Sequence, residues 1–304
     1  MSIAGASFPG GPLRPRTRRF LVLGDLQRTS RLELLREQND RERLAIVDAM
    51  AQEDVDFVAL LGDLVFRGDD AGDWARFDAL TAALRSRGNP VLSVLGNHDY
   101  GVVACRARAA FDGRFPHLAG RRWSSIAYGP LLIVLLDTNR LRLSRTAWAA
   151  QGAWLSEMLS SADADPEVRG VLVLTHHPPY TNSSVTGDDL GVQRDLVPIF
   201  SRAQKTLAML SGHVHSHERF ARDGKLFVVS GGGGGPRAAL HQGARRRHHD
   251  DLFAGPRLRP FHFLRVTVES TSLAVDVVGF DKGEVQARTL DAFALPLAAR
   301  PAEG

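Results

Sequence analysis

The chain has 304 residues, of which 44% are hydrophobic, and its 38 basic and 34 acidic residues give a formal net charge of +4. This length and apolar content suffice for a sizeable core in one large globular domain or two unequal ones, and one domain is the simpler prediction. The single cysteine, Cys105, excludes an intramolecular disulfide and favours the cytoplasm, and apolar runs far shorter than about 20 residues exclude a transmembrane helix.

Two clusters of basic residues, Arg14 to Arg19 and Arg245 to His249, raise the question of a phosphate-rich partner. Neither cluster contains interleaved aromatic residues that could stack on bases. We therefore interpret both as solvated loops, and nucleic acid is not an expected partner. The pair Arg18-Arg19 is superficially similar to a twin-arginine export signal, but the apolar run behind it is too short and a cleavage site is lacking.

The first part of the chain shows regular alternation of apolar segments after a leader, residues 1–17, that is rich in Gly, Pro and Arg and is predicted to be flexible. The elements predicted in chain order are a strand over 20–23, a helix over about 31–53, a strand over 57–61, a helix around 74–87 and a strand over 91–95. Strands that alternate with helices indicate βαβ units, in which functional groups collect at the carboxyl ends of the strands.

The second part of the chain is predicted to contain more strands than the first. The elements predicted next are an antiparallel pair over 122–128 and 131–137, a helix over 144–160, a strand over 170–174, a helix over 189–202, a strand over 206–210 and a strand over 226–229. A basic inserted loop, residues 236–260, precedes two strands over 261–269 and 272–280, which suggest a second sheet packed on the first. The predicted domain covers 18–289, and residues 290–304 are predicted to be a tail.

Polar residues follow the apolar segments abruptly at five places. The five segments are Gly24-Asp25-Leu26-Gln27, Gly62-Asp63-Leu64, Gly96-Asn97-His98-Asp99, His176-His177-Pro178 and Gly212-His213-Val214-His215. In the last of them, His213 and His215 would leave an extended strand on the same side, where two imidazoles can bind a metal.

In their order, spacing and position after strands, these segments resemble the motifs of the calcineurin-like metallophosphoesterase family, and the resemblance spans about residues 18 to 235. It implies an α/β fold, a four-layer α/β/β/α sandwich of two mixed β-sheets flanked by helices. It also implies a hydrolase of phosphate esters, a phosphomonoesterase or phosphodiesterase, that uses two divalent metal ions and a metal-activated hydroxide.

The resemblance also implies a role for each matching residue. It makes Asp63 the ligand that bridges the two metals and His98 the group that contacts the phosphoryl oxygen or protonates the leaving group. Asp99 is expected to orient His98, and Asn97 to contact substrate as well as metal. The expected ligands of the first metal are Asp25, Gln27 and His215, and those of the second are Asn97, His176 and His213.

One position departs from the commonest family pattern. Gln27 stands where that pattern has a histidine, although some branches of the family carry Asp-x-Gln. An amide oxygen is a harder donor than an imidazole and suits zinc or iron less well. We therefore expect manganese to be favoured, with iron or zinc as alternatives.

The segment Gly212 to Arg219 also resembles a signature of purple acid phosphatases, but Leu64-Val65-Phe66-Arg67 offers no tyrosine where those enzymes carry a metal ligand. Two residues are tentative substrate contacts: His217, for which a loop role is an equal alternative, and Tyr180, which follows the His176 motif. The run Gly231 to Gly235 lacks the Lys-Ser or Lys-Thr of a P-loop and is interpreted as a loop that approaches the metal site closely.

Two other functions remain as alternatives. A weakly active or inactive phosphate-binding module of the same fold is suggested by Gln27 and by the arginine-rich loop. Binding of nucleic acid through the basic clusters leaves the ligand set without a role and is ranked below it. The residues that select the substrate are expected in the loops Asn182 to Asp189 and Pro236 to Pro260.

Overall fold

The computed structural model describes residues 13–299 apart from 31–32, 34 and 254. Its strands form two six-stranded sheets. In spatial order, the first sheet consists of β12 (Arg288–Pro296), β11 (Ser272–Phe280), β10 (Phe261–Val268), β1 (Arg19–Leu23), β2 (Phe57–Leu60) and β3 (Val91–Ser93). The second sheet consists of β4 (Ser124–Tyr128), β5 (Leu131–Leu135), β6 (Gly170–Thr175), β7 (Thr206–Ser211), β9 (Lys225–Ser230) and β8 (His217–Arg222).

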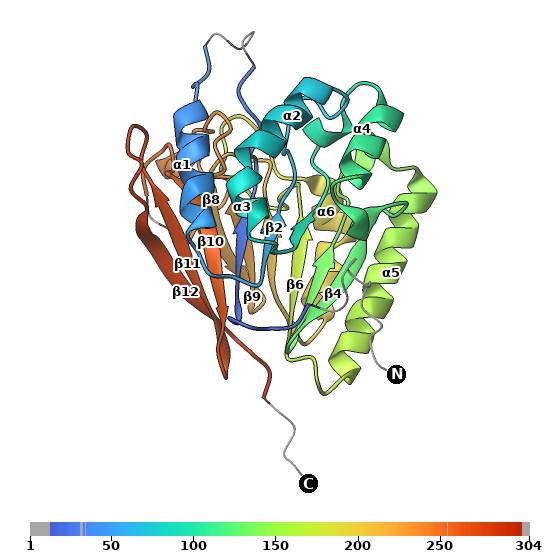
Figure 1. Ribbon diagram of the computed structural model, residues 1–304. Helices are drawn as coiled ribbons and strands as arrows, with labels where there is room; N and C mark the ends of the chain where they lie inside the picture. The colour runs from blue at the N-terminus through green and yellow to red at the C-terminus, as the bar shows by residue number, and fades with distance from the viewer. Residues whose placement is uncertain (1–12, 31–32, 34, 254, 300–304) are drawn as a thin grey trace.

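Helices cover the outer face of each sheet (Figure 1). The helices on the first sheet are α1 (Asp40–Ala51), α2 (Ala71–Leu80), α3 (Ala82–Ser86) and α4 (Ala104–Asp112). The helices on the second sheet are α5 (Arg145–Ala164), α6 (Leu190–Asp195) and α7 (Val197–Arg202). The four-layer α/β/β/α sandwich expected from the sequence is therefore confirmed. In the described part of the chain, every helix is too short or too polar to span a bilayer.

The alternation of side chains along buried strands produces these layers. In β1, Phe20 and Val22 pack between the two sheets, whereas Leu21 and Leu23 pack under the helices. Successive side chains of a strand point to opposite faces, so a strand that is apolar at every position must be covered on both. The three large apolar clusters correspond to the space between the sheets and to the two sheet–helix layers.

An aromatic cluster holds the sheets together at the amino end of β2. The ring of Phe57 is fully buried, stacks on Phe20 at 4.6 Å between centroids and meets Tyr128 of the opposite sheet edge-on at 4.9 Å. We expect Phe57→Ala to lower the free energy of unfolding by about 3–5 kcal/mol, because it leaves a cavity between the sheets. Urea unfolding followed by tryptophan fluorescence measures this, with Leu141→Ala at an exposed position as the control. A loss equal to that of the control would contradict it.

The first helix is shorter than its predicted range of 31–53. Helix α1 begins at Asp40, and Leu35, which falls within the predicted helix, is fully exposed. Local polar contacts hold the preceding loop instead: the Thr29 hydroxyl donates to the carbonyl of Glu37, and Glu33 accepts from the backbone N–H of Ser30. Such side-chain bonds to the backbone compete with helix formation. Part of the predicted range, residues 31–32 and 34, lies outside the described residues.

The C-terminal strands also differ from the prediction. The hairpin β10–β11 does not start a second sheet but pairs antiparallel with β1 and extends the first. The expected tail from residue 290 is corrected as well, because β12 pairs with β11 along its length and contains the buried Leu295, and Leu297 directly after it is also buried. Without β12, the strand β11 and its alternate apolar residues would form an open edge of the sheet. The additional strand covers this edge.

The described part of the leader, residues 13–17, is held by hydrogen bonds and by a β-bridge. The Asp56 carboxylate accepts hydrogen bonds from the backbone N–H groups of Arg16, Thr17 and Arg18, and Leu13 forms a β-bridge with Tyr128. Residues 13–17 are therefore not a free segment, which corrects that part of the expected flexible leader. Residues 1–12 lie outside the described residues.

Candidate metal centre

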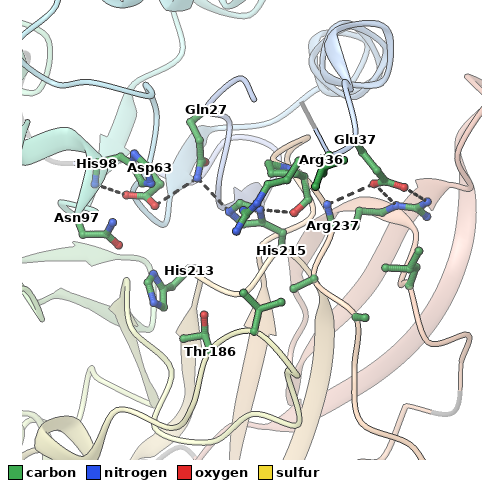
Figure 2. A pocket seen from close by; sticks show the side chains of 16 residues that line it. Gln27, Arg36, Glu37, Asp63, Asn97, His98, Thr186, His213, His215 and Arg237 are labelled. Carbon is green, nitrogen blue, oxygen red and sulfur yellow. Dashed lines mark hydrogen bonds and ion pairs between the residues drawn. The ribbon is translucent and has the colours of Figure 1, made fainter. Parts of the chain in front are cut away.

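The expected ligands lie where the carboxyl ends of five strands meet. Asp25, Asp63 and Asn97 follow β1, β2 and β3, which are parallel neighbours in the first sheet. His176 and His213 follow β6 and β7, which are parallel neighbours in the second. Because the two sheets face each other, both sets reach one place. Figure 2 shows three of these residues, Asp63, Asn97 and His213, around one cavity.

Three of these residues turn the chain sharply. Asp25, Asp63 and His213 have φ values of 65°, 52° and 66°, in the left-handed region that non-glycine residues seldom occupy. Such conformations are unfavourable by about 1–3 kcal/mol each and cluster at functional sites. His213 therefore lies in a turn beyond the end of β7, and its convergence with His215 does not come from an extended strand.

Glycine allows the backbone to come close to the ligands. A Cβ on Gly231 would lie 2.6 Å from Oδ2 of Asp25, and one on Gly235 would lie 2.5 Å from the ring of His215. These distances support the interpretation of the run Gly231 to Gly235 as a close-approach loop beside the centre, because no larger residue fits there.

The imidazoles of His176 and His215 are oriented by backbone carbonyls. Nδ1 of His176 lies 2.8 Å from the carbonyl oxygen of Leu61, and Nδ1 of His215 lies 2.8 Å from that of Pro236. A carbonyl can only accept, so Nδ1 carries the proton in both rings. Nε2 is left to face the centre, the arrangement usual for metal-binding histidines.

The donor atoms form two groups joined by one oxygen. On one side, Nε2 of His215 lies 3.5 Å from Oδ1 of Asp25 and 3.0 Å from Nε2 of Gln27. On the other side, Nε2 of His176 lies 3.1 Å from Oδ1 of Asn97 and 3.2 Å from Nδ1 of His213.

The joining atom is Oδ2 of Asp63, which lies 3.4 Å from Gln27 Nε2 and 3.3 Å from His176 Nε2. Figure 2 shows Asp63 next to Gln27, with Asn97 and His213 below them in this view. Ligands bound at about 2.1 Å to one ion are separated by about 3.0–3.4 Å, so these separations suit metal coordination.

Two buried oxygen atoms of the centre lack a hydrogen-bond partner among the described residues. Oδ2 of Asp25 and Oε1 of Gln27 are buried and accept no hydrogen bond. A half-turn of the Gln27 amide exchanges its oxygen and nitrogen and aims the oxygen at the centre. Buried polar atoms are normally satisfied, and a metal ion satisfies both of these. The residues present therefore fit divalent metal ions.

The centre has strong internal electrostatics. Burial lowers the pKa of His176, but the Asp63 carboxylate outweighs burial and raises the pKa to about 9. Burial and the charge on His176 lower the pKa of His213 to about 3. Burial raises the pKa of Asp63, yet the positive charge of His176 holds it well below its usual value. The His176 imidazolium therefore balances the Asp63 carboxylate, and binding of a cation would release the proton of His176.

Asp99 holds the backbone of the centre. Its carboxylate accepts from the N–H groups of Asp63, Leu64 and Gly96, each at 2.9 Å. Burial and the neighbouring Asp63 raise its pKa to about 7. Both oxygens are thus directed at the two loops that carry Asp63 and Asn97, whereas the expected role was to orient His98.

His98 lies at the edge of the centre with one ring nitrogen fixed. Its backbone N–H donates to Oδ1 of Asp63 at 2.8 Å, and Nδ1 lies 2.7 Å from the carbonyl of Phe66. Nδ1 therefore carries the proton, and Nε2 is available to the cavity that His98 lines.

Two tentative substrate contacts lie elsewhere. Tyr180 packs on Phe227 at 5.0 Å and under the guanidinium of Arg222 at 3.7 Å, and it does not line the cavity as the described residues form it. His217 is buried in β8, with Nδ1 3.1 Å from the carbonyl of Val229. Strand formation from residue 217 onward directs its ring into the interior, which corrects the expectation of a substrate contact.

His177 follows His176 in the chain but does not belong to the expected set of metal ligands. Its Nδ1 lies 3.0 Å from the hydroxyl of Thr138, and burial lowers its pKa well below the usual range. Although His176, His177 and His213 lie close enough to hold one ion, this contact fits a packing role for His177.

Comparison with known proteins agrees with this geometry. The family model described as calcineurin-like phosphoesterase matches residues 18–217, about two thirds of the chain. The chain belongs to the calcineurin-like phosphoesterase family. A search of curated protein sequences gives no match.

Solved structures share the calcineurin-like phosphoesterase fold at low sequence identity. A purple acid phosphatase from yellow lupin seeds is 18% identical with a TM-score of 0.71, and the match covers 93% of this chain but only 54% of that chain. GAP50, an anchor in the inner membrane complex of Plasmodium, is 17% identical with a TM-score of 0.66, over 93% of this chain and 89% of its own. A dimetal phosphatase from Danio rerio is 15% identical with a TM-score of 0.64, over 95% and 100%. These likenesses establish the fold.

Proposed function

We propose that the protein hydrolyses phosphate esters at a dinuclear metal centre. The observation that carries this proposal is the position of Asp63 Oδ2. This oxygen lies 3.4 Å from Nε2 of Gln27 in the first group of expected ligands and 3.3 Å from Nε2 of His176 in the second. The first ion would be held by Asp25, Gln27 and His215, the second by Asn97, His176 and His213, and Asp63 would bind both. When bound, two divalent cations supply Lewis acidity toward the phosphoryl oxygens and lower the pKa of water.

The other residues of the centre are assigned by their contacts. His98 presents Nε2 to the cavity, where it can contact a phosphoryl oxygen or donate a proton to the leaving oxygen. Asn97 lines the same cavity and would contact substrate as well as metal. Asp99 is a positioning residue, because its bonds to the backbone fix where Asp63 and Asn97 lie.

A colorimetric assay tests this function directly. The protein is stripped with a chelator, reloaded separately with manganese, iron, zinc or magnesium, and assayed with p-nitrophenyl phosphate and bis-p-nitrophenyl phosphate. The first substrate reports monoesterase activity and the second diesterase activity. Turnover that requires added metal supports the proposal, and no turnover of either ester with any metal would reject it.

We propose manganese as the preferred metal at the first site. Gln27 would supply an amide oxygen there in place of the histidine of the commonest family pattern, and an imidazole suits zinc or iron better. Full activity of the stripped protein with zinc alone would contradict this preference.

The variant Gln27→His tests this assignment. We expect the substitution to raise the affinity of the first site for zinc by about tenfold or more, because an imidazole replaces an amide oxygen. Zinc retained after dialysis against a buffered zinc series is measured by mass spectrometry. Gln204→His, which places a new imidazole on the surface, is the matched control. Equal zinc retention by the variant and the parent protein would show that residue 27 does not contact the metal.

A second candidate is a weakly active or inactive phosphate-binding module. It is favoured by Gln27 and by the likeness to GAP50, which is described as an anchor. This candidate predicts phosphate binding without turnover in the colorimetric assay. For either function we propose the cytoplasm as the compartment, on the basis of the single cysteine, and no nucleic-acid partner.

A further inference from the structure

The metal centre forms only one end of a larger cavity. The cavity has a volume of about 400 Å³, and its lining continues from the ligands to Leu35, Val185 and Leu258. This volume lies in the range of cavities that hold a small organic molecule. A phosphoryl group at the ligands would occupy only part of it, so the remainder is available to the ester substituent.

Aliphatic side chains are concentrated in that remainder. Ten large hydrophobic side chains of the described residues are exposed, and three of them, Leu35, Val185 and Leu258, line this one cavity. Single exposed aliphatic residues are common on protein surfaces, but several in one hollow beside polar groups indicate a binding site.

Backbone contacts hold one wall of the cavity in place. Ser183 forms a β-bridge with Leu240, and Ala239 forms one with Leu258, so three chain segments are joined side by side. The Ser183 hydroxyl accepts from the N–H of Val185 at 3.2 Å. Buried Glu218 fixes the start of the same loop by accepting from the N–H of Asn182 at 2.7 Å. The aliphatic wall is therefore formed before any ligand binds.

The opposite wall is tied to the first by an ion pair. Glu37 follows Leu35 in the loop before α1, and its carboxylate accepts from both Nε and Nη2 of Arg237, at 3.0 and 2.7 Å. Figure 2 shows this pair at the far side of the cavity from Asp63 and His98. The loop that carries Leu35 is thus joined to the loop that carries Leu258.

The charges around the cavity favour a neutral substituent over an anionic one. Both arginines among the described lining residues already face a carboxylate: Arg237 is paired with Glu37 at 2.7 Å and Arg36 with Glu33 at 3.4 Å. Apart from three imidazoles, the described lining contains no aromatic ring on which a nucleobase could stack. The wall offers neither a free cation for a polyphosphate nor a platform for a base.

We propose that this cavity is a subsite for an aliphatic group, and that the substrates are phosphate esters of aliphatic alcohols. This inference rests on the proposed function, because it places the phosphoryl group at the metal centre and the carbon chain against Val185 and Leu258. The recognition is hydrophobic, so the gain should grow with the apolar area of the chain until the cavity is full.

A homologous series of n-alkyl phosphates, from methyl to octyl, tests the subsite with the manganese-loaded protein. We expect kcat/KM to rise by about two- to fourfold per methylene over the first several carbons, as partial to full burial of each group predicts. Adenosine 5′-monophosphate and a phosphoserine peptide should be hydrolysed more slowly than hexyl phosphate. A series that is flat from methyl to octyl would overturn the subsite while leaving the proposed function intact.

Binding measured without turnover separates the two proposals. Calorimetric titration of the manganese-loaded protein with n-alkylphosphonates, which are not hydrolysed, should give affinities that rise and heat-capacity changes that become more negative with chain length. If the phosphonates behave in this way but no phosphate ester is hydrolysed, the subsite stands and the catalytic proposal fails. Phosphonate affinities that do not depend on chain length overturn the subsite.

Substitutions in the aliphatic wall of the cavity test where the carbon chain binds. We expect Val185→Ser and Leu258→Ser each to lower the ratio of octyl to methyl phosphonate affinity by about fivefold or more, because each replaces an apolar contact by a hydroxyl. Leu141→Ser, at an exposed leucine outside the cavity, is the matched control and should keep the ratio of the parent protein. Unchanged ratios in both wall variants would reject the placement of the chain.

Discussion

Asp63→Asn is expected to remove activity toward p-nitrophenyl phosphate and to leave the protein depleted of metal. The carboxylate supplies the single oxygen that lies close to both ligand groups, and an amide cannot provide two anionic contacts. Loss of a residue that only supports a ligand typically lowers metal affinity or activity by about 10- to 100-fold, so loss of this ligand should lower turnover by more than about 100-fold.

The fold should survive this substitution. Residue 63 has a φ of 52°, and asparagine tolerates the left-handed region better than most residues. Turnover is compared with metal content from mass spectrometry and with far-ultraviolet circular dichroism. Asp48→Asn, on the exposed side of α1, is the matched control and should behave as the parent protein. Parental turnover by the Asp63→Asn variant would refute the bridging role.

Gly96→Ala is expected to damage stability and metal binding together. A methyl group at residue 96 would lie 2.1 Å from the backbone nitrogen of Asp63 and 2.2 Å from its Oδ1. Neither atom can move without displacing the loop after β2, and the bond from Gly96 N–H to Asp99 lies in the same place. We expect a loss of about 1–3 kcal/mol in the free energy of unfolding and a 10- to 100-fold loss in metal affinity.

Thermal unfolding with and without added manganese measures both effects of Gly96→Ala. The parent protein should gain stability on addition of metal, and the variant should gain much less. The control is Gly113→Ala, at a residue with φ of −64° where the nearest atom to a new methyl lies 3.4 Å away, so its stability should be unchanged or slightly raised. Equal responses of the Gly96 variant and the parent protein to metal would show that the close approach is unimportant.

The order of layers and the place of the ligands were accessible from the sequence because both depend on local patterns. Short apolar runs that end in Asp, Asn or His predict strand ends, and the resemblance adds the expected division of these residues between two metals. The convergence of His213 and His215 was predicted for a wrong reason, because the chain turns at His213 instead of continuing as a strand.

Contacts between distant segments account for what the sequence did not predict. The carboxylate of Asp99 is turned toward three backbone N–H groups, and no spacing rule distinguishes this from an orientation toward His98. Leu35 falls within the range predicted to be helical, yet local polar bonds and the Glu37–Arg237 pair hold its loop at the cavity. His217 shares the spacing of His213 and His215 but begins β8.

The candidate ligands come from both sheets, and this has a consequence for the order in which the molecule folds. Asp25, Asp63 and Asn97 belong to one sheet, and His176, His213 and His215 follow strands of the other. Neither half alone offers a complete set, so tight metal uptake should begin only after the sheets have docked. Uptake of metal during refolding would then report when the last step of folding occurs. A bound ion would also slow unfolding, because the two sheets could not separate without releasing it.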